Sequence, residues 1–176
     1  MKSKPIKVLE IGIGNGFVSD YLKKRGINIT TCDIDQKLNP DIVASVLNLP
    51  FEDEQFDVVA CYEVLEHIPY DRVSLAISEL ARVSKKRVII SIPNISKAFP
   101  FSIYIPKIGR IYFFISVPLL MKKHYFDGEH YWELGKRSYL PKNFIKLLNK
   151  DGLIIENNYR VFELPYHHFF VCTKKQ

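Results

Sequence analysis

Three glycines stand at alternate positions near the start of the chain, in the stretch VLEIGIGNGF of residues 8–17. Glycine loses more conformational freedom on folding than any other residue, so Gly12, Gly14 and Gly16 are expected where the backbone needs a positive φ or is approached closely. An apolar stretch typical of a buried strand precedes them, and residues 17–26 follow with apolar positions at helical spacing. Strand, glycine turn and helix together predict a ligand site at the N-terminus of that helix.

Two features narrow the kind of ligand. A dinucleotide fingerprint has its third small residue three positions after the second glycine, and Phe17 occupies that place, which counts against NAD. Asp33 ends a second predicted strand, where a carboxylate can accept hydrogen bonds from both hydroxyls of a ribose; the alternative is that it caps the next turn. Glu10 ends the first strand, where it can attract an ammonium group, fix the loop by accepting backbone N–H bonds, or do both.

The composition is that of one domain. The chain has 176 residues, of which 47% are hydrophobic, enough for one full core. The net charge of +6 and the pI of about 9.1 permit an anionic partner such as nucleic acid or lipid without requiring one. Three cysteines scattered over predicted strands indicate reduced thiols, and the short polar N-terminus does not fit a signal peptide. We therefore expect a cytoplasmic protein.

Strand and helix patterns alternate up to about residue 94 and return near the end of the chain. Helices are predicted over 17–26, 70–83 and 140–152. Strands are predicted over 6–11, 27–33, 41–46, 56–62, 86–93, 153–162 and 167–174. Such alternation is typical of an α/β fold, with a parallel sheet and helices on both of its faces. The aromatic, proline-containing segment 95–137 breaks the pattern.

Four stretches carry a resemblance to a known family: VLEIGIGNGF, CDID, LNLPFEDEQFDVVACYEVLEHI and the two closing strands. Together they resemble the class I S-adenosylmethionine-dependent methyltransferases, in particular the branch with the signature LPF, FDVV and EHI. The similarity is good over 6–93 and loose near the C-terminus. It implies a Rossmann-like fold in a single methyltransferase domain spanning 1–176. The implied sheet is mostly parallel and seven-stranded, in the order 3-2-1-4-5-7-6, with an antiparallel last strand.

The resemblance also implies S-adenosyl-L-methionine as the cofactor. This methyl donor has a ribose and an ammonium group but no phosphate, which suits the carboxylates of Asp33 and Glu10. The residues expected to contact it are Glu10, Gly12, Ile13, Gly14, Asn15, Gly16, Asp33, Ile34, Val46, Leu47, Tyr62 and Glu63. Relatives commonly carry an acid five residues before the proline of LPF. This chain has Ser45 there, which leaves the adenine to backbone groups of Val46 and Leu47.

The acceptor side is less strongly patterned. His67 is the candidate catalytic residue, because it follows the fourth strand and could take a proton from a hydroxyl or ammonium acceptor. The alternative is a histidine that packs in its loop. His130, Tyr131 and Trp132 form a polar and aromatic cluster that could line an acceptor pocket or pin a surface loop. The adjacent histidines at 167–168 are not a metal signature, and we expect no metal.

The segment 95–137 is expected to cap the active site, because it leaves the fifth strand at the sheet edge that carries the glycine turn. We expect its 98–120 part to cover the site. The apolar run 111–120 is too short to span a bilayer and contains Pro118. Apolar residues flanked by lysines and arginines fit an anionic membrane surface, a lipid-like acceptor or a second copy of the chain; burial as a simple cap is the alternative.

These observations predict a cytoplasmic enzyme that transfers a methyl group from S-adenosylmethionine to a small or lipid-like acceptor, with peripheral membrane contact as a further expectation. The basic second half keeps methylation of RNA or protein open, although CYEVLEH stands where a tetrapeptide of the NPPY type would be expected. Another alternative is a non-catalytic S-adenosylmethionine-binding module that regulates a partner enzyme.

Overall fold

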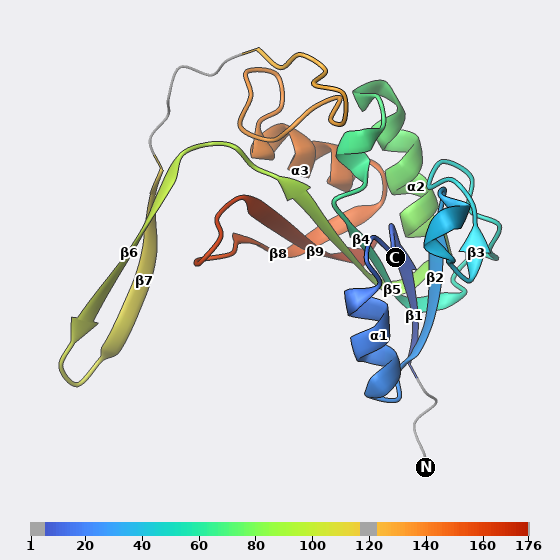
Figure 1. The fold of residues 1–176 in the computed structure, drawn as a ribbon. Coiled ribbons are helices and arrows are strands. Elements are labelled where there is room, and N and C mark those ends of the chain that lie inside the picture. The colour runs from blue at the N-terminus through green and yellow to red at the C-terminus, as the bar shows by residue number, and fades with distance from the viewer. Residues whose placement is uncertain (1–5, 117–122, 176) are drawn as a thin grey trace.

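The computed structural model describes residues 6–116 and 123–175. Its main sheet has seven strands in the order β3-β2-β1-β4-β5-β9-β8 (Figure 1). The strands are β1 Lys7–Ile11, β2 Asn28–Asp33, β3 Ile42–Val43, β4 Phe56–Tyr62, β5 Ser84–Pro93, β8 Leu153–Arg160 and β9 His167–Lys174. β9 runs antiparallel to both β5 and β8, and the other pairs are parallel. The predicted strand order and the antiparallel last strand are confirmed.

Helices cover both faces of this sheet, as predicted. The helices are α1 Phe17–Lys24, α2 Val73–Val83 and α3 Pro141–Lys150, with 3₁₀ turns η1 Gln36–Leu38, η2 Leu65–His67 and η3 Tyr70–Arg72. Neighbouring residues of a strand point to opposite faces. In β1, Leu9 lies in the core cluster that includes Ile77 of α2, whereas Glu10 lies near Ser19 of α1. α1 therefore covers one face, and α2 with α3 covers the other.

β3 is shorter than the predicted strand over 41–46. Asp41 turns its side chain back to β2, where one carboxylate oxygen accepts hydrogen bonds from the backbone N–H and the hydroxyl of Thr31. Beyond Val43 the chain bends into a turn, closed by the N–H of Asn48 donating to the carbonyl of Ser45. This turn brings residues 45–47 to the edge of the sheet where β2 ends.

The segment 95–137 contains a hairpin that the sequence pattern did not predict. β6 Ala98–Ile105 and β7 Gly109–Ser116 pair antiparallel and project away from the main sheet (Figure 1). Apart from Gly109, their register places large apolar residues on one face: Phe99, Phe101, Ile103, Ile105, Ile111, Phe113 and Ile115. On the opposite face, the rings of Tyr112 and Phe114 pack against Phe162, with centroids 4.9 and 5.5 Å away.

The hairpin points away from the glycine turn, so residues 98–116 do not provide the cover that we expected of 98–120; residues 117–120 lie outside the described part of the chain. The return segment 123–134 comes back to the carboxyl end of β5. There the N–H of Leu134 donates to the carbonyl of Pro93, and the N–H of Ile95 donates to the carbonyl of Leu134. The segment that lies beside the candidate site is therefore the return segment.

Candidate cofactor and acceptor site

The glycine turn joins β1 to α1, and its three glycines have positive φ values of 78° at Gly12, 53° at Gly14 and 74° at Gly16. A Cβ on Gly12 would lie 2.2 Å from Cγ2 of Val64, so the turn is in direct contact with the loop after β4. A Cβ on Gly14 would meet no atom of the described residues within 4 Å. The turn is therefore closed toward β4 and open on its outer side, where a ligand can approach.

Asp33, at the end of β2, holds this turn in place. Its Oδ2 accepts a hydrogen bond from the N–H of Ile13 at 2.9 Å, and its Oδ1 accepts one from the N–H of Asp35 at 2.9 Å. This is the turn-capping role that we considered as the alternative. Because each carboxylate oxygen has a further lone pair, the same side chain can also accept from ribose hydroxyls.

Residues 34 and 45–47 form the side of the site predicted to face an adenine. Ile34 is 74% exposed beside Asp33, whereas Val46 is buried. The hydroxyl of Ser45, which stands where relatives carry an acid, accepts from the N–H of Leu47 at 3.2 Å. Ser45 therefore stabilises its own turn, and an apolar side chain at position 34 is left to contact a flat ring.

The end of β4 carries a small polar network. Glu63 has a positive φ of 51°, and its Oε1 accepts from the hydroxyl of Ser91 at 2.6 Å and lies 3.4 Å from Nδ1 of His167. Tyr62 packs edge-on against Phe169, and burial raises the pKa of its hydroxyl to about 12. The sequence pattern gave His167 no role at the site, because its partner Glu63 is distant in the chain.

The predicted acceptor residues His67 and His130 are brought together. Their rings meet edge to face, with centroids 4.9 Å apart. Nδ1 of His67 lies 3.1 Å from the carbonyl of Glu129, and Nδ1 of His130 lies 3.3 Å from Oε1 of Glu133. Tyr131 is 42% exposed, and its N–H donates to the carbonyl of Glu66 at 2.8 Å.

Trp132 does not join this surface, so of the two roles predicted for the cluster it has the second, that of pinning its segment, and not that of lining an acceptor pocket. The residue is fully buried, and its indole N–H donates to the carbonyl of Leu65 at 3.0 Å. Its ring packs against Tyr70, Tyr139 and Phe144 in the core. Because no part of the side chain is exposed, Trp132 anchors the return segment and presents no surface to an acceptor.

Glu66 is a second residue that the sequence pattern missed. It is fully buried, and neither carboxylate oxygen has a hydrogen-bond partner among the described residues. Burial is the main cause that raises the pKa of this carboxyl to about 8. The available signal was the acid directly before His67 in LEHI, which the interpretation of that run as a family signature obscured.

Comparisons with known proteins show which families the chain is similar to. A family model described as a methyltransferase domain matches residues 9–92. The ubiquinone biosynthesis O-methyltransferase of Aeromonas salmonicida is 25% identical over 96% of this chain and 71% of its own length. The mitochondrial protein of that name from Dictyostelium discoideum is 26% identical over 85% of this chain, which spans only 52% of that relative.

Solved structures agree on the fold. The 1,6-didemethyltoxoflavin-N1-methyltransferase of Burkholderia thailandensis, crystallised with S-adenosylhomocysteine, superposes with a TM-score of 0.66 at 15% identity, covering 98% of this chain and 72% of its own. Magnesium protoporphyrin IX methyltransferase from Synechocystis superposes with a TM-score of 0.65 at 19% identity, covering 97% and 75%. Residues 9–92 of the chain therefore match a methyltransferase domain, and the described structure has the fold of S-adenosylmethionine-dependent methyltransferases.

A buried, unpaired carboxylate of the candidate site has the chemistry that S-adenosylmethionine requires. Glu10 is 2% exposed, and its Oε2 has no hydrogen-bond partner among the described residues. Burial raises the pKa of its carboxyl. The ammonium group of S-adenosylmethionine would supply the missing positive charge, directly or through water. The open side of Gly14 and the free lone pairs of Asp33 then remain for the rest of the donor.

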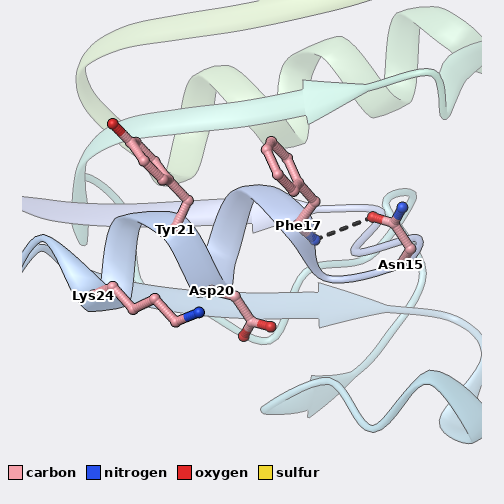
Figure 2. A pocket seen from close by; sticks show the side chains of 5 residues that line it. All are labelled: Asn15, Phe17, Asp20, Tyr21 and Lys24. Atoms are coloured by element: carbon pink, nitrogen blue, oxygen red, sulfur yellow. Dashed lines mark hydrogen bonds between the residues drawn. The ribbon is translucent and has the colours of Figure 1, made fainter.

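A separate hollow of about 340 Å³ lies on the outer surface of α1, lined by Asn15, Phe17, Asp20, Tyr21 and Lys24. Figure 2 shows the rings of Phe17 and Tyr21 together on one side of the helix, with Asp20 and Lys24 on the other. Only Asn15 belongs to the residues expected to hold the donor, and its Oδ1 accepts from the N–H of Phe17 at 3.1 Å. The hollow is therefore a feature of the helix surface rather than of the methyltransferase site.

Proposed function

We propose that this methyltransferase moves the methyl group of S-adenosylmethionine to a small or lipid-like acceptor with a nucleophilic oxygen. The observation that carries the proposal is the glycine turn, closed by Val64 on one side and open at Gly14 on the other. The O-methyltransferase names of the two relatives support an oxygen acceptor. The residues predicted to hold the donor are those of the turn together with Glu10, Asp33, Ile34, Val46, Leu47, Tyr62 and Glu63.

The chain's task in this reaction is to position two molecules. When bound, S-adenosylmethionine supplies a methyl group already activated by a positive sulfur, so in-line orientation provides most of the rate. The acceptor approaches from the side formed by η2 and the return segment 123–134, which we propose as the cap within 95–137. His67 lies there with its Nδ1 against the carbonyl of Glu129, which leaves Nε2 for chemistry at the acceptor.

Calorimetry with S-adenosylhomocysteine tests the donor site without knowledge of the acceptor. Wild-type protein should bind it and should not bind NAD. Asp33→Ala should weaken binding by about 1–3 kcal/mol, the cost of losing a charge-assisted acceptor. Asp41→Asn is a matched control, because Asp41 is also an acid beside β2 but bonds to Thr31. Tight NAD binding with no binding of S-adenosylhomocysteine would overturn the proposal.

We further propose that the apolar face of the β6–β7 hairpin rests on an anionic membrane, which would give access to a lipid-like acceptor. Phe99, Phe101, Ile103, Ile111 and Ile115 are each 43–52% exposed on this face. The sequence contains no Asp or Glu from residue 80 to 126, so the flanking Lys107 and Arg110 have no local acidic neighbour in the chain. Two hairpins packed together would place like charges near each other, which favours an anionic surface over a second copy. Among the described residues, no helix has the length and apolar character to cross a bilayer.

Sedimentation with phosphatidylglycerol and phosphatidylcholine vesicles tests the hairpin. The protein should pellet with the anionic vesicles at low salt and much less at high salt, because each basic residue near such a surface contributes about 1 kcal/mol. Phe101→Ser with Phe113→Ser should abolish pelleting, since these rings stack on the apolar face. Tyr104→Ser on the opposite face is the control. Two results would contradict the membrane proposal: a wild-type dimer that becomes a monomer in the double variant, or pelleting with RNA instead of vesicles.

A further inference from the structure

We infer that Glu66, His67 and His130 form a binding site for one divalent transition-metal ion, of the kind typified by Zn²⁺ or Mn²⁺. One carboxylate oxygen of Glu66 and one ring nitrogen from each histidine all lie within 4.8 Å of one another. Ligand atoms that share an ion with bonds of about 2.1 Å stand roughly 3–4 Å apart, so small side-chain movements close the site. Two imidazoles and one carboxylate are a donor set that such ions prefer.

The buried carboxylate of Glu66 is the second and independent sign of a ligand. The side chain is fully buried, and both of its oxygens are without a hydrogen-bond partner in the described residues. Burying a carboxylate with no partner is costly, and native proteins pair such groups or use them to coordinate metals. A cation between Glu66 and the two histidines would satisfy these oxygens.

The surroundings of the two histidines match those of metal ligands. A ligating histidine usually points its other ring nitrogen at a carbonyl or a carboxylate, which fixes its orientation. Nδ1 of His67 lies 3.1 Å from the carbonyl of Glu129, and Nδ1 of His130 lies 3.3 Å from Oε1 of Glu133. In both residues Nε2 is therefore the nitrogen available to an ion.

A second group of possible ligands shares His130 and competes with this assignment. Asp127, His130 and Glu133 also have donor atoms within 4.8 Å of one another. Asp127 is exposed, however, and its Oδ1 already accepts from the N–H groups of Glu129 and His130. Glu133 lies 3.7 Å from Nζ of Lys136, which supplies its counter-charge. The unpaired carboxylate is in the first group, so we assign the ion to Glu66, His67 and His130.

The backbone holds these ligands together across a long stretch of sequence. The N–H of Tyr131 donates to the carbonyl of Glu66, and the indole of Trp132 donates to the carbonyl of Leu65. Trp132 is locked in the core by its aromatic neighbours, so His130 is held over η2 rather than on a free loop. Such a rigid, partly buried frame is what a specific metal site needs.

The position of the site suggests what the ion does, and this step rests on the proposed function. η2 directly follows Val64, the side chain in contact with Gly12 of the glycine turn. Three protein ligands leave a coordination position open, where an acceptor hydroxyl can bind and lose its proton to water more readily. The oxygen then forms a bond to the methyl carbon while the carbon–sulfur bond breaks and its electron pair goes to sulfur. The products are the methyl ether and S-adenosylhomocysteine, and His67 acts as a ligand rather than as a base.

Metal binding itself is the test. Untagged protein is stripped with a chelator, titrated with Zn²⁺ or Mn²⁺ alone, and its metal content is measured after dialysis. Wild type should retain about one equivalent per chain. Glu66→Gln and His130→Asn should each weaken binding by about 10–100-fold or more, the scale for disturbing groups around a metal site. Co²⁺ should give visible absorption bands in wild type that both variants lose.

Two control variants separate this site from its neighbours. Asp127→Asn removes the exposed acid of the competing group, and His167→Ala removes a histidine at the same sheet edge but beside Glu63. Both should bind metal as wild type does. Metal content near zero in folded wild type, or binding that Glu66→Gln retains while Asp127→Asn abolishes it, would overturn the inference. Thermal melting shows which variants are folded.

S-adenosylhomocysteine binding, measured on the same samples, distinguishes the two proposals. If the protein binds S-adenosylhomocysteine but no metal, the metal-site proposal is wrong and the methyltransferase proposal stands. If it binds metal but no S-adenosylhomocysteine, the methyltransferase proposal is wrong and the metal site stands. Loss of both in wild type would contradict both.

Discussion

The two halves of the site are built in different ways. The proposed donor side comes from one continuous stretch, residues 8–63, and its key contact joins Asp33 to Ile13 across 20 residues. The acceptor side joins η2 to the return segment across more than 60 residues, from His67 to Glu129 and from Leu65 to Trp132. The residues proposed to hold the donor therefore form a short local frame. The acceptor side is assembled by tertiary packing, which leaves it free to differ.

Trp132→Ala should have the largest effect of the variants that test this comparison, and the effect is on the stability of the acceptor side. The ring is fully buried and packs against Tyr70 and Phe144, so truncation should lower the free energy of unfolding by about 3–5 kcal/mol. Urea denaturation measures the change. Tyr131→Ala, one residue away but 42% exposed, should cost far less. Equal losses at the two positions would show that the return segment is not anchored by the tryptophan.

Gly12 belongs to the glycine turn and contacts Val64 of the loop after β4, so its replacement should disturb both halves of the site. Gly12→Ala forces a side chain to a φ of 78° and against Val64, so the loss of stability should exceed the roughly 1–2 kcal/mol of the backbone conformation alone. Gly14→Ala should cost only that backbone strain, because its Cβ would point to open space. It should nevertheless weaken S-adenosylhomocysteine binding, because the ligand is proposed to occupy that space.

A double-mutant cycle sharpens this prediction. If the contact with Val64 is what makes Gly12 necessary, Val64→Ala should recover part of the stability lost in Gly12→Ala, with a coupling of about 0.5–3 kcal/mol. Thermal or chemical denaturation of the four proteins gives the coupling directly. Strict additivity would mean that the two halves are energetically independent at this point.

What the sequence predicts follows the same division. The seven strands of the main sheet and the glycine turn follow from hydrophobic periodicity and glycine spacing, because those signals are local. The order of the strands followed from the family resemblance alone. The β6–β7 hairpin was missed because its aromatic residues and prolines lack a simple alternation with polar positions: one face is apolar, and the other carries Tyr104, Tyr112 and Phe114 as well. Trp132 was misplaced because its burial depends on Tyr70 and Phe144, which no spacing connects to it.

Ser45→Asp has the smallest expected effect and tests the departure from the family pattern. An acid at this position could accept from the amino group of adenine, so binding of S-adenosylhomocysteine should tighten by about 0.5–1.5 kcal/mol. The hydroxyl oxygen of Ser45 accepts a hydrogen bond from the N–H of Leu47, and an aspartate carboxylate can retain that bond. Calorimetry at one salt concentration compares the two proteins. Weaker binding would indicate that the adenine lies elsewhere.

The proposed donor site, built from local contacts, and the proposed metal site, built from long-range contacts, lie on either side of Val64. A crystal of the protein grown with Zn²⁺ and S-adenosylhomocysteine, measured at the zinc absorption edge, tests both at once. We predict a single anomalous peak between Glu66, His67 and His130, and nucleoside density over the turn of Gly12, Gly14 and Gly16 beside Asp33. Density for the nucleoside away from that turn, or an anomalous peak at Asp127 and Glu133 with Glu66 unligated, would contradict the account.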